Sequence, residues 1–417
     1  MSKIEQLIQQ LCPEGVEYKK LGEVCEIITD NVAAGSFAEI ARNVKYIREP
    51  DFALLVRTKD LKANFKNTDL IYTDEHAFEY LWRVNLNKES IILPNVGNCG
   101  EVYYTTAESF PHPHCVLASN AILVRSLSQN NRFLFHLFRS SSFQRPLMKI
   151  VSPVGQTKFN KGELKKILIP LPPLAVQQEI VRILDAFTQL EAELEAELEA
   201  RKKQYAYYRD TLLSFEHDDP KVEWKKLGEV CENICSGGTP STSHREYYSG
   251  TIPWLRTQEV DWNDIYDTST KITEEAIKNS SAKLIPVNCV IVAMYGATAA
   301  KACINKIPLT TNQACCNLQI DESQAYHKYV YYWICKNYEV LKAMGEGSQN
   351  NINGKKIKDF LIPLPPLPVQ EEIVRILDKF SAITSDLQSG LPAEIEARKK
   401  QYEYYRDQLL TFKRKEA

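Results

Sequence analysis

Basic, amide and hydroxyl side chains, the types that contact nucleic-acid bases and phosphates, gather in a few short segments. Arg and Lys can bind guanine or hold phosphates, and Asn and Gln can pair with adenine. Two of the segments, "NVGNCG" and "MYGATAAK", are glycine-bearing turns, which let the backbone approach a ligand closely. The candidate contacts are Arg57, Thr58, Lys59 and Lys62 in "VRTKDLK", Asn98 in "NVGNCG", Gln156, Lys158 and Asn160 in "SPVGQTKFNKGELKK", Arg256, Thr257 and Gln258 in "LRTQEV", Tyr295, Thr298 and Lys301 in "MYGATAAK", and Gln349, Asn350 and Asn353 in "EGSQNNINGKKIKD".

No catalytic motif accompanies these residues. The sequence contains neither a GxxxxGK[ST] phosphate loop nor an H-E-x-x-H motif. A DNA methyltransferase would need a glycine-rich cofactor loop and a [DN]-P-P-[YF] motif, but both Pro-Pro pairs lie in "PLPPL". The sequence therefore favours a binding function over an enzymatic one.

Two groups of side chains could suggest zinc. They are His112, His114 and Cys115 in "PHPHC", and Cys231 and Cys235 in "CENIC". Neither group is followed by a second pair at zinc-finger spacing, so we expect a structural role for them and predict no metal and no cofactor.

The composition is that of a soluble globular protein. The chain has 417 residues, of which 44% are hydrophobic and 25% are charged, enough for two to four domains. Its net charge of −2 does not by itself indicate nucleic-acid binding, because the location of charge matters more than its sum. No apolar run approaches the roughly 18 residues of a membrane span. Eleven cysteines without a C-x-x-C pair or an apparent export signal predict reduced thiols in the cytoplasm.

The most informative feature is an internal repeat of domain size. Three phrases occur twice: "VEYKKLGEVCEII" (Val16–Ile28) as "VEWKKLGEVCENI" (Val222–Ile234), "LIPLPPLAVQQEIVRILDAF" (Leu168–Phe187) as "LIPLPPLPVQEEIVRILDKF" (Leu361–Phe380), and "EARKKQYAYYRDTLLSF" (Glu199–Phe215) as "EARKKQYEYYRDQLLTF" (Glu396–Phe412). Between them, about 29–152 and 235–347 retain only faint similarity. Decay of one half would have eroded the repeated phrases as well, so we infer two related modules with one frame and different targets.

Each "LPPL" predicts the start of a helix, because proline fixes φ and fits the first turn. Residues 176–215 contain no Pro or Gly and carry one apolar stripe at helical spacing, which predicts about 40 helical residues spanning roughly 60 Å. Such a long helix needs a partner, and the natural partner is its own repeat copy, antiparallel to it. In that copy, Gly390 and Pro392 should break or kink the helix.

The first helix also contains a tandem tetrad, "LEAELEAELEA" (Leu190–Ala200). Its leucines Leu190, Leu194 and Leu198 recur every four residues. One tetrad adds about 6 Å of helix, or one to two base pairs of DNA. The segment could be a solvated helix with exposed glutamates, and it could also act as a ruler of adjustable length.

Taken together, "IPLPPL" followed by Gln, "EIVRILD", the "RKKQY" helix and the twofold repeat resemble the specificity (S) subunit of type I restriction–modification enzymes. The stretch "SGGTPSTSHREYYSGTIPWLRTQEV" (Ser236–Val260) is similar to the opening of target-recognition domains in that family. The resemblance covers essentially the whole chain. The "LEAE" wording and the break at Gly390 depart from the pattern.

The resemblance implies an α+β fold with two pseudo-two-fold-related α/β target-recognition domains, separated by two long antiparallel helices. It implies that each domain recognises one half of a bipartite, asymmetric site in double-stranded DNA. The helices would set the gap and dock two methyltransferase (M) subunits, which bind S-adenosylmethionine and methylate adenine N6. Restriction (R) subunits would join the complex, and the S chain itself would hold no cofactor.

The domain boundaries expected on this basis divide the chain into five parts: 1–17, an N-terminal helical segment; 18–155, the first target-recognition domain; 156–216, a central region with the long spacer helix; 217–348, the second target-recognition domain; and 349–417, a C-terminal region with its spacer helix. Two alternatives stay open at this point. One is a single-chain DNA methyltransferase, and the other is a non-catalytic coiled-coil scaffold with two ligand domains.

Overall fold

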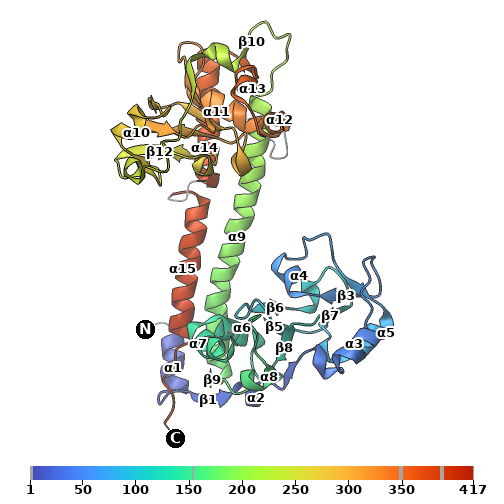
Figure 1. Ribbon diagram of the computed structural model, residues 1–417. Coiled ribbons are helices and arrows are strands. Elements are labelled where there is room, and N and C mark those ends of the chain that lie inside the picture. The colour runs from blue at the N-terminus through green and yellow to red at the C-terminus, as the bar shows by residue number, and fades with distance from the viewer. Residues whose placement is uncertain (1–2, 153–154, 347–350, 386–388, 417) are drawn as a thin grey trace. The chain divides into compact units, whose positions relative to one another are not determined.

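The structure is a computed structural model that describes residues 3–152, 155–346, 351–385 and 389–416. It divides into two compact units: unit 1 is Met1–Leu194 with Ile395–Ala417, and unit 2 is Glu195–Glu394. Each unit combines helices with small sheets, which confirms the predicted two-domain α+β class (Figure 1). None of the helices in the described ranges is long and apolar enough to cross a membrane.

Unit 1 contains three small sheets and short helices around them. Its strands are β1 (Glu17–Lys20), β2 (Ile27–Thr29), β3 (Ala53–Val56), β4 (Tyr72–Thr73), β5 (Ser90–Pro94), β6 (Tyr103–Thr105), β7 (Cys115–Leu117), β8 (Ala121–Arg125) and β9 (Leu168–Leu171). Its helices are α1 (Lys3–Leu11), α2 (Leu21–Val24), η1 (Asn31–Ala33), α3 (Phe37–Asn43), α4 (Thr58–Lys62), α5 (Glu75–Tyr80), η2 (Trp82–Val84), η3 (Ala107–Ser109), α6 (Asn131–Arg139), α7 (Ser141–Ile150), α8 (Lys161–Leu164), the first part of α9 (Leu174–Leu212) and nearly all of α15 (Leu391–Leu409).

Unit 2 repeats this plan with additional strands. Its strands are β10 (Glu223–Lys226), β11 (Cys231–Ser236), β12 (Ile252–Leu255), β13 (Asp264–Ile265), β14 (Lys271–Ile272), β15 (Leu284–Ile285), β16 (Val290–Ala293), β17 (Ala302–Asn305), β18 (Leu309–Thr311), β19 (Cys315–Ile320) and β20 (Leu361–Leu364). Its helices are the rest of α9, η4 (Leu227–Val230), η5 (Arg245–Tyr248), η6 (Thr257–Glu259), α10 (Glu274–Lys278), η7 (Gly296–Thr298), α11 (His327–Lys336), α12 (Tyr338–Ala343), α13 (Gly354–Lys358) and α14 (Leu367–Ser385).

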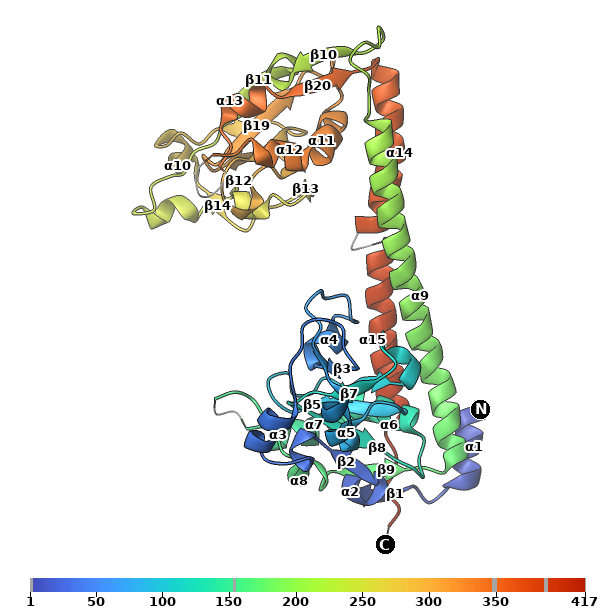
Figure 2. The same cartoon turned by 90° about the vertical axis from the view of Figure 1, so that its right-hand side faces the viewer.

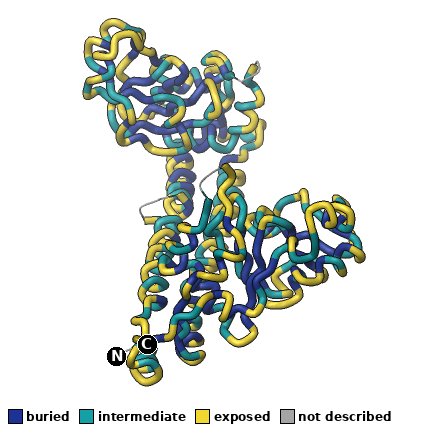
Figure 3. Tube along the Cα trace, turned by 60° about the horizontal axis from the view of Figure 1, so that its bottom comes forward, coloured by how far each residue is buried: buried dark blue, intermediate teal, exposed yellow. Residues whose placement is uncertain are grey.

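The two units share one topology although their middle segments barely align. Unit 1 has sheets in the order β2-β8-β5-β6 and β4-β3-β7, and unit 2 has β11-β19-β16-β17-β13 and β14-β12-β18-β15. The same pairs recur with the same direction, including the parallel pairs β3 with β7 and β12 with β18. The central strands "SIILP" and "VIVA" are buried along their whole length, as an apolar run in a covered sheet predicts. Figure 3 shows buried segments in the interior of each unit.

The repeated sequence phrases pair with one another inside each unit. β1 runs antiparallel to β9, with Glu17 opposite Leu171, and β10 runs antiparallel to β20, with Glu223 opposite Leu364 (Figure 2). After each opening strand, the next residue donates its backbone N–H to the segment that precedes the second strand: Leu21 to Ile167 and Leu227 to Phe360, both at 2.8 Å. The opening phrase and the "LIPL" phrase of each unit therefore form one paired structure. Because both units contain this same structure, both phrases are nearly identical in the two copies.

Each Pro-Pro pair precedes a helix, as predicted. α9 begins at Leu174 and α14 at Leu367, directly after the prolines. Five residues after the first proline of each pair there is a buried glutamine, Gln177 or Gln370. Gln177 donates to the carbonyl of Pro172 and Gln370 to that of Pro365, both at 2.9 Å. The side-chain oxygen of Gln177 also accepts from the backbone of Asn130. The glutamine of the repeated phrase thus fastens the helix start to the rest of its unit.

The predicted pairing of the long helix with its repeat copy is confirmed within each unit (Figure 1). In unit 1, Phe187 of α9 stacks on Tyr405 of α15 with ring centroids 5.4 Å apart, and in unit 2 Tyr208 of α9 stacks on Phe380 of α14 at 5.1 Å. These are the same two repeat positions with their roles exchanged. In unit 1, Glu191 of α9 is paired with Lys399 of α15. Moving from Phe187 to Glu191 along α9 thus corresponds to moving back from Tyr405 to Lys399 along α15, so the two helices are antiparallel.

The predicted break in the second copy is also confirmed. α14 ends at Ser385 and α15 begins at Leu391, next to Gly390 and Pro392, whereas α9 runs without interruption for 39 residues. The intervening residues 386–388 lie outside the described ranges. Among the leucines of the tetrads, Leu190 is 37% exposed and Leu194 and Leu198 are half-buried.

A buried polar contact fixes α15 in unit 1. The imidazole of His136 lies 2.9 Å from the hydroxyl of Tyr402 and 2.8 Å from the carboxylate of Asp185. Burial lowers the pKa of His136, so a neutral ring can donate from Nε2 to Asp185 and accept from Tyr402 at Nδ1. Three distant segments of the chain therefore meet at one side chain.

We predict that Tyr402→Phe leaves His136 Nδ1 buried without a donor and lowers the local stability of unit 1 by about 1–3 kcal/mol. Amide hydrogen exchange of α6 and α15 in the full chain measures this. Tyr404→Phe, at an exposed neighbouring position, is the control and should change protection by less than about 0.5 kcal/mol. Equal effects of the two substitutions would contradict the assignment.

Candidate nucleic-acid interface

In each unit, loops that are distant in sequence are held together by backbone hydrogen bonds. In unit 1, Gly97 donates to Thr157 O at 2.8 Å and Phe159 donates to Asn95 O at 3.1 Å. This brings the loop after β5 against the polar loop before β9. Three predicted contacts, Asn98, Gln156 and Lys158, therefore lie exposed on adjoining loops.

Unit 2 has the same arrangement. Ile352 donates to Met294 O at 2.8 Å, at the repeat positions of Phe159 and Asn95. The hydroxyl of Thr298 donates to Thr257 O at 2.7 Å and so joins η7 to η6. Gly97 and Gly296 both have a left-handed backbone, with φ of +83° and +81°, which glycine adopts without strain. Tyr295 and Gln258 are exposed beside these turns.

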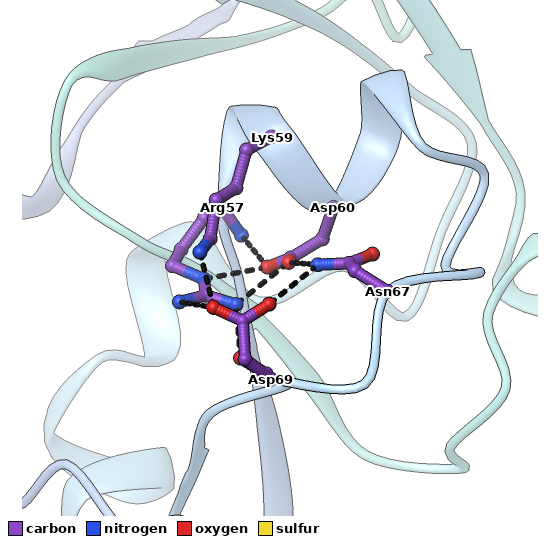
Figure 4. A network of polar contacts seen from close by, with 5 residues as sticks. All are labelled: Arg57, Lys59, Asp60, Asn67 and Asp69. Carbon is purple, nitrogen blue, oxygen red and sulfur yellow. Dashed lines mark hydrogen bonds and ion pairs between the residues drawn. The ribbon is translucent and has the colours of Figure 1, made fainter. Parts of the chain in front are cut away.

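In unit 1, Arg57 is committed to an internal network (Figure 4). Its guanidinium donates twice to Asp60, from Nε at 2.8 Å and Nη2 at 2.7 Å, and once to the carbonyl of Asp69 at 2.6 Å. Asp60 is fully buried and also accepts from Asn67 at 2.6 Å. The hydrogen bonds with Asp60 raise the pKa of Arg57. This bidentate pair positions α4 and leaves little of the guanidinium for a ligand.

The exposed lysines of the same helix have acidic neighbours. Lys59 pairs with Asp69 (Figure 4). Lys62 pairs with Glu101 at 2.8 Å. The Lys62–Glu101 pair links α4 to the loop that carries Asn98. Exposed pairs of this kind contribute little to stability, so both ammonium groups can exchange their partner for a phosphate at low cost.

Arg256 in unit 2 has a different environment from Arg57. The longer side chain of Glu259 turns back to the backbone N–H groups of Arg256 at 3.1 Å and Ser269 at 2.8 Å. Within the described ranges, no carboxylate pairs with the Arg256 guanidinium, whose Nε is buried without a hydrogen-bond partner. Its Nη2 reaches only Ser269 Oγ, at 3.3 Å. Lys301 is paired with Asp261 at 2.5 Å.

Two of the predicted contacts have a local structural role. Asn160 accepts from the backbone of Glu163 at 2.9 Å, and Asn353 accepts from that of Lys356 at 3.0 Å. Each is the N-cap of the short helix that follows, α8 or α13, which explains why both copies carry asparagine there. Both remain exposed. Gln349 and Asn350 lie outside the described residues.

The histidines and cysteines that could have suggested zinc are used in packing. His114 stacks on Phe52 with ring centroids 4.7 Å apart. The Nδ1 of His112 lies 2.9 Å from the carbonyl oxygen of His114, which accepts when that nitrogen carries the proton. Cys115 is buried in β7. In the described part of the chain, no group of three or more His, Cys, Asp or Glu side chains could hold a metal ion.

The sequence predicted these loops as candidates, but it did not identify the acidic partners Asp60, Glu101 and Asp69 of their basic residues. One signal was present: "RTKD" and "RTQE" both place an acidic residue three positions after arginine, the spacing of a capping box. In both units this acid accepts from the arginine backbone N–H, at 3.0 Å from Asp60 and 3.1 Å from Glu259.

Comparison with known proteins assigns the family. The family model for the type I restriction modification DNA specificity domain matches residues 13–200 and again 221–397. The chain therefore belongs to the type I restriction–modification specificity subunits and carries two specificity domains, as the sequence resemblance predicted.

Among its relatives, the EcoR124I/EcoR124II specificity subunit of Escherichia coli is 44% identical over 264 residues, covering 60% of this chain and 64% of that subunit. The match thus spans less than two thirds of the relative. The fold is similar to the crystal structure of a type I system S subunit from M. genitalium, with a TM-score of 0.54, 13% identity and coverage of 95% and 96%. It is also similar to a chain from a study of complex assembly and conformational transition of the type I system, with a TM-score of 0.60, 17% identity and coverage of 95% and 97%.

The Arg57 network generates a prediction about stability. Asp60→Asn removes the buried charge that Arg57 binds, and we expect it to lower the free energy of unfolding of unit 1 by about 3 kcal/mol. Asp69→Asn, at an exposed position of the same network, should cost less than about 1 kcal/mol. Urea denaturation measures both, and comparable losses would show that Asp60 has no special role.

Proposed function

We propose that each unit contacts one half of a bipartite, asymmetric site in double-stranded DNA. In this proposal the chain has no catalytic activity. Two M subunits dock on its helices and methylate adenine N6, and R subunits restrict unmodified DNA. The observation that carries the proposal is that one topology presents equivalent loops with different side chains: Lys59, Val96 and Asn98 in unit 1 stand at the repeat positions of Gln258, Tyr295 and Ala297 in unit 2.

The proposed contacts divide by chemistry. Lys59, Lys62 and Lys158 are suited to phosphates, because ammonium groups act as exchangeable point charges. Arg256, Gln258 and Asn98 have donors and acceptors suited to base edges. Arg57 would act by positioning α4. The remaining candidates stay predictions: Thr58, Gln156, Asn160, Thr257, Tyr295, Thr298, Lys301, Gln349, Asn350 and Asn353.

A net charge of −2 is compatible with this role if the M subunits complete the positive surface around the DNA. The eleven free cysteines fit a reducing compartment, so we place the complex in the cytoplasm.

Methylation by reconstituted complexes tests the proposal. Purified M subunit with the full chain should methylate adenines at one bipartite sequence, and M alone should methylate none selectively. Sequencing of modified adenines in the treated DNA gives the answer. Methylation by the chain alone would favour the single-chain methyltransferase, and unselective methylation by the complex would refute a role in recognition.

The tetrads of α9 generate a second prediction. Deleting residues 190–193 shortens this helix by about 6 Å, and we expect the preferred gap between the half-sites to shorten by one to two base pairs. Both half-site sequences should stay unchanged, because the loops are not touched. Methylome sequencing measures gap and half-sites together, and an altered half-site with an unchanged gap would refute the ruler.

A further inference from the structure

The turn between β18 and β19 of unit 2, residues 312–314, lies among the loops of the candidate interface. On one side, the backbone N–H of Asn312 donates to the carbonyl of the residue before Arg256, at 2.9 Å. On the other side, the carbonyl of Ala314 accepts from the backbone N–H of the residue before Tyr295, at 2.8 Å. The turn is therefore fixed between the two segments that carry Arg256 and Tyr295.

Gln313 forms the tip of this turn, and its side chain is exposed. Its Oε1 accepts a hydrogen bond from the hydroxyl of Thr239, which is also exposed. An amide oxygen has two lone pairs and an amide nitrogen carries two N–H donors. Within the described ranges, no acceptor is paired with the Nε2 of Gln313. The side chain thus offers an acceptor and a donor side by side, in an orientation that Thr239 holds.

Two glycines bring Thr239 to the turn. The backbone N–H of Gly238 donates to the carbonyl of Thr311, the last residue of β18, at 2.9 Å, and its carbonyl accepts from the indole of Trp254 at 3.0 Å. A Cβ atom at Gly237 or Gly238 would lie only 2.0 or 2.2 Å from a backbone atom, so neither position admits a side chain. The segment before Thr239 is therefore held closely against the end of β18, where the turn begins.

The equivalent turn of unit 1 carries a different side chain at its tip. It consists of residues 118–120 between β7 and β8, and it is fixed in the same way. Its first residue donates to the carbonyl of Val56 at 2.8 Å, and its last residue accepts from the backbone N–H of Asn95 at 3.1 Å. These matching hydrogen bonds place Ser119 at the position of Gln313. The frame fixes the turn in both units and leaves the residue at its tip free to differ.

We propose that Gln313 contacts the edge of an adenine in the half-site of unit 2, and that Thr239 is a positioning residue for its amide. The inference rests on the proposed function, because it assigns one base contact within that interface. In the major groove an amide pairs with adenine through two hydrogen bonds, with its oxygen accepting from the N6 amino group and its nitrogen donating to N7. The second lone pair of Oε1 leaves room for this pairing while Thr239 is bound.

Methylation by complexes of the full chain with M subunit tests the contact. The half-site of unit 2 is the one that changes when residues 235–347 are replaced by those of another family member. Methylation rates are then measured on duplexes in which each base pair of the site is varied in turn. Gln313→Leu should lower the preference for adenine at one position of this half-site by about tenfold, because a bidentate contact is lost. All other positions and the gap should stay as in the wild type.

Thr239→Val should relax the same position by roughly threefold, because the amide loses the hydrogen bond that orients it. Thr239→Ser keeps the hydroxyl and should behave as the wild type. Gln319→Leu is the matched control, since Gln319 lies further along β19 and its amide donates to Glu232 at 2.6 Å. It should leave the preference at every position unchanged.

Unchanged selectivity in Gln313→Leu, an equal loss at every position, or a change in the other half-site would overturn the proposal. Gln313→Glu has nearly the same shape but no N–H donor, so it should also lose the preference for adenine, and it tests the contact even if Gln313→Leu fails to fold. A wild-type complex that methylates no bipartite sequence would refute the proposed function. Selective methylation by the wild type, with unchanged selectivity in both Gln313 variants, would refute the Gln313 contact alone.

Discussion

The fold depends on the closure of each unit by two short antiparallel strand pairs, β1 with β9 and β10 with β20. Each pair joins the beginning of a recognition segment to its end, immediately before the helix that follows. The buried glutamines Gln177 and Gln370 then fasten that helix to the same unit. Everything between the paired strands can change in sequence without disturbing the closure, provided that its own sheets still form. This constraint explains why the repeated phrases are nearly identical while the segments between them have diverged.

The sequence predicted those features that depend on local chemistry. The Pro-Pro pairs predicted where α9 and α14 begin. The absence of Pro and Gly from residues 176–215 predicted the length of α9, and Gly390 with Pro392 predicted the break between α14 and α15. It could not predict which partner each side chain finds over long distances. Arg57 is the clearest case. An arginine side chain is suited to a base contact, but the fold shows that this guanidinium donates its hydrogen bonds to Asp60 and to the carbonyl of Asp69.

Comparison of the two units shows how one frame acquires different chemistry. A single methylene distinguishes Asp60 from Glu259, yet the shorter acid binds the arginine side chain and the longer one binds backbone N–H groups. Arg57 is consequently held in an ion pair, whereas the Arg256 guanidinium has no carboxylate partner among the described residues. Other equivalent positions differ more strongly, since unit 1 has Asn31 and Asn95 where unit 2 has Gly237 and Met294. Small changes at equivalent positions thus give the two domains different side-chain chemistry, and the proposed recognition of an asymmetric DNA site requires such a difference.

The central claim is that the two recognition segments act independently on a common frame. The most direct measurement replaces residues 29–152 with the corresponding segment of another family member and sequences the adenines methylated by the complex. The account predicts a new sequence in one half-site, with the other half-site and the gap unchanged. A change in both half-sites, or in neither, would contradict it.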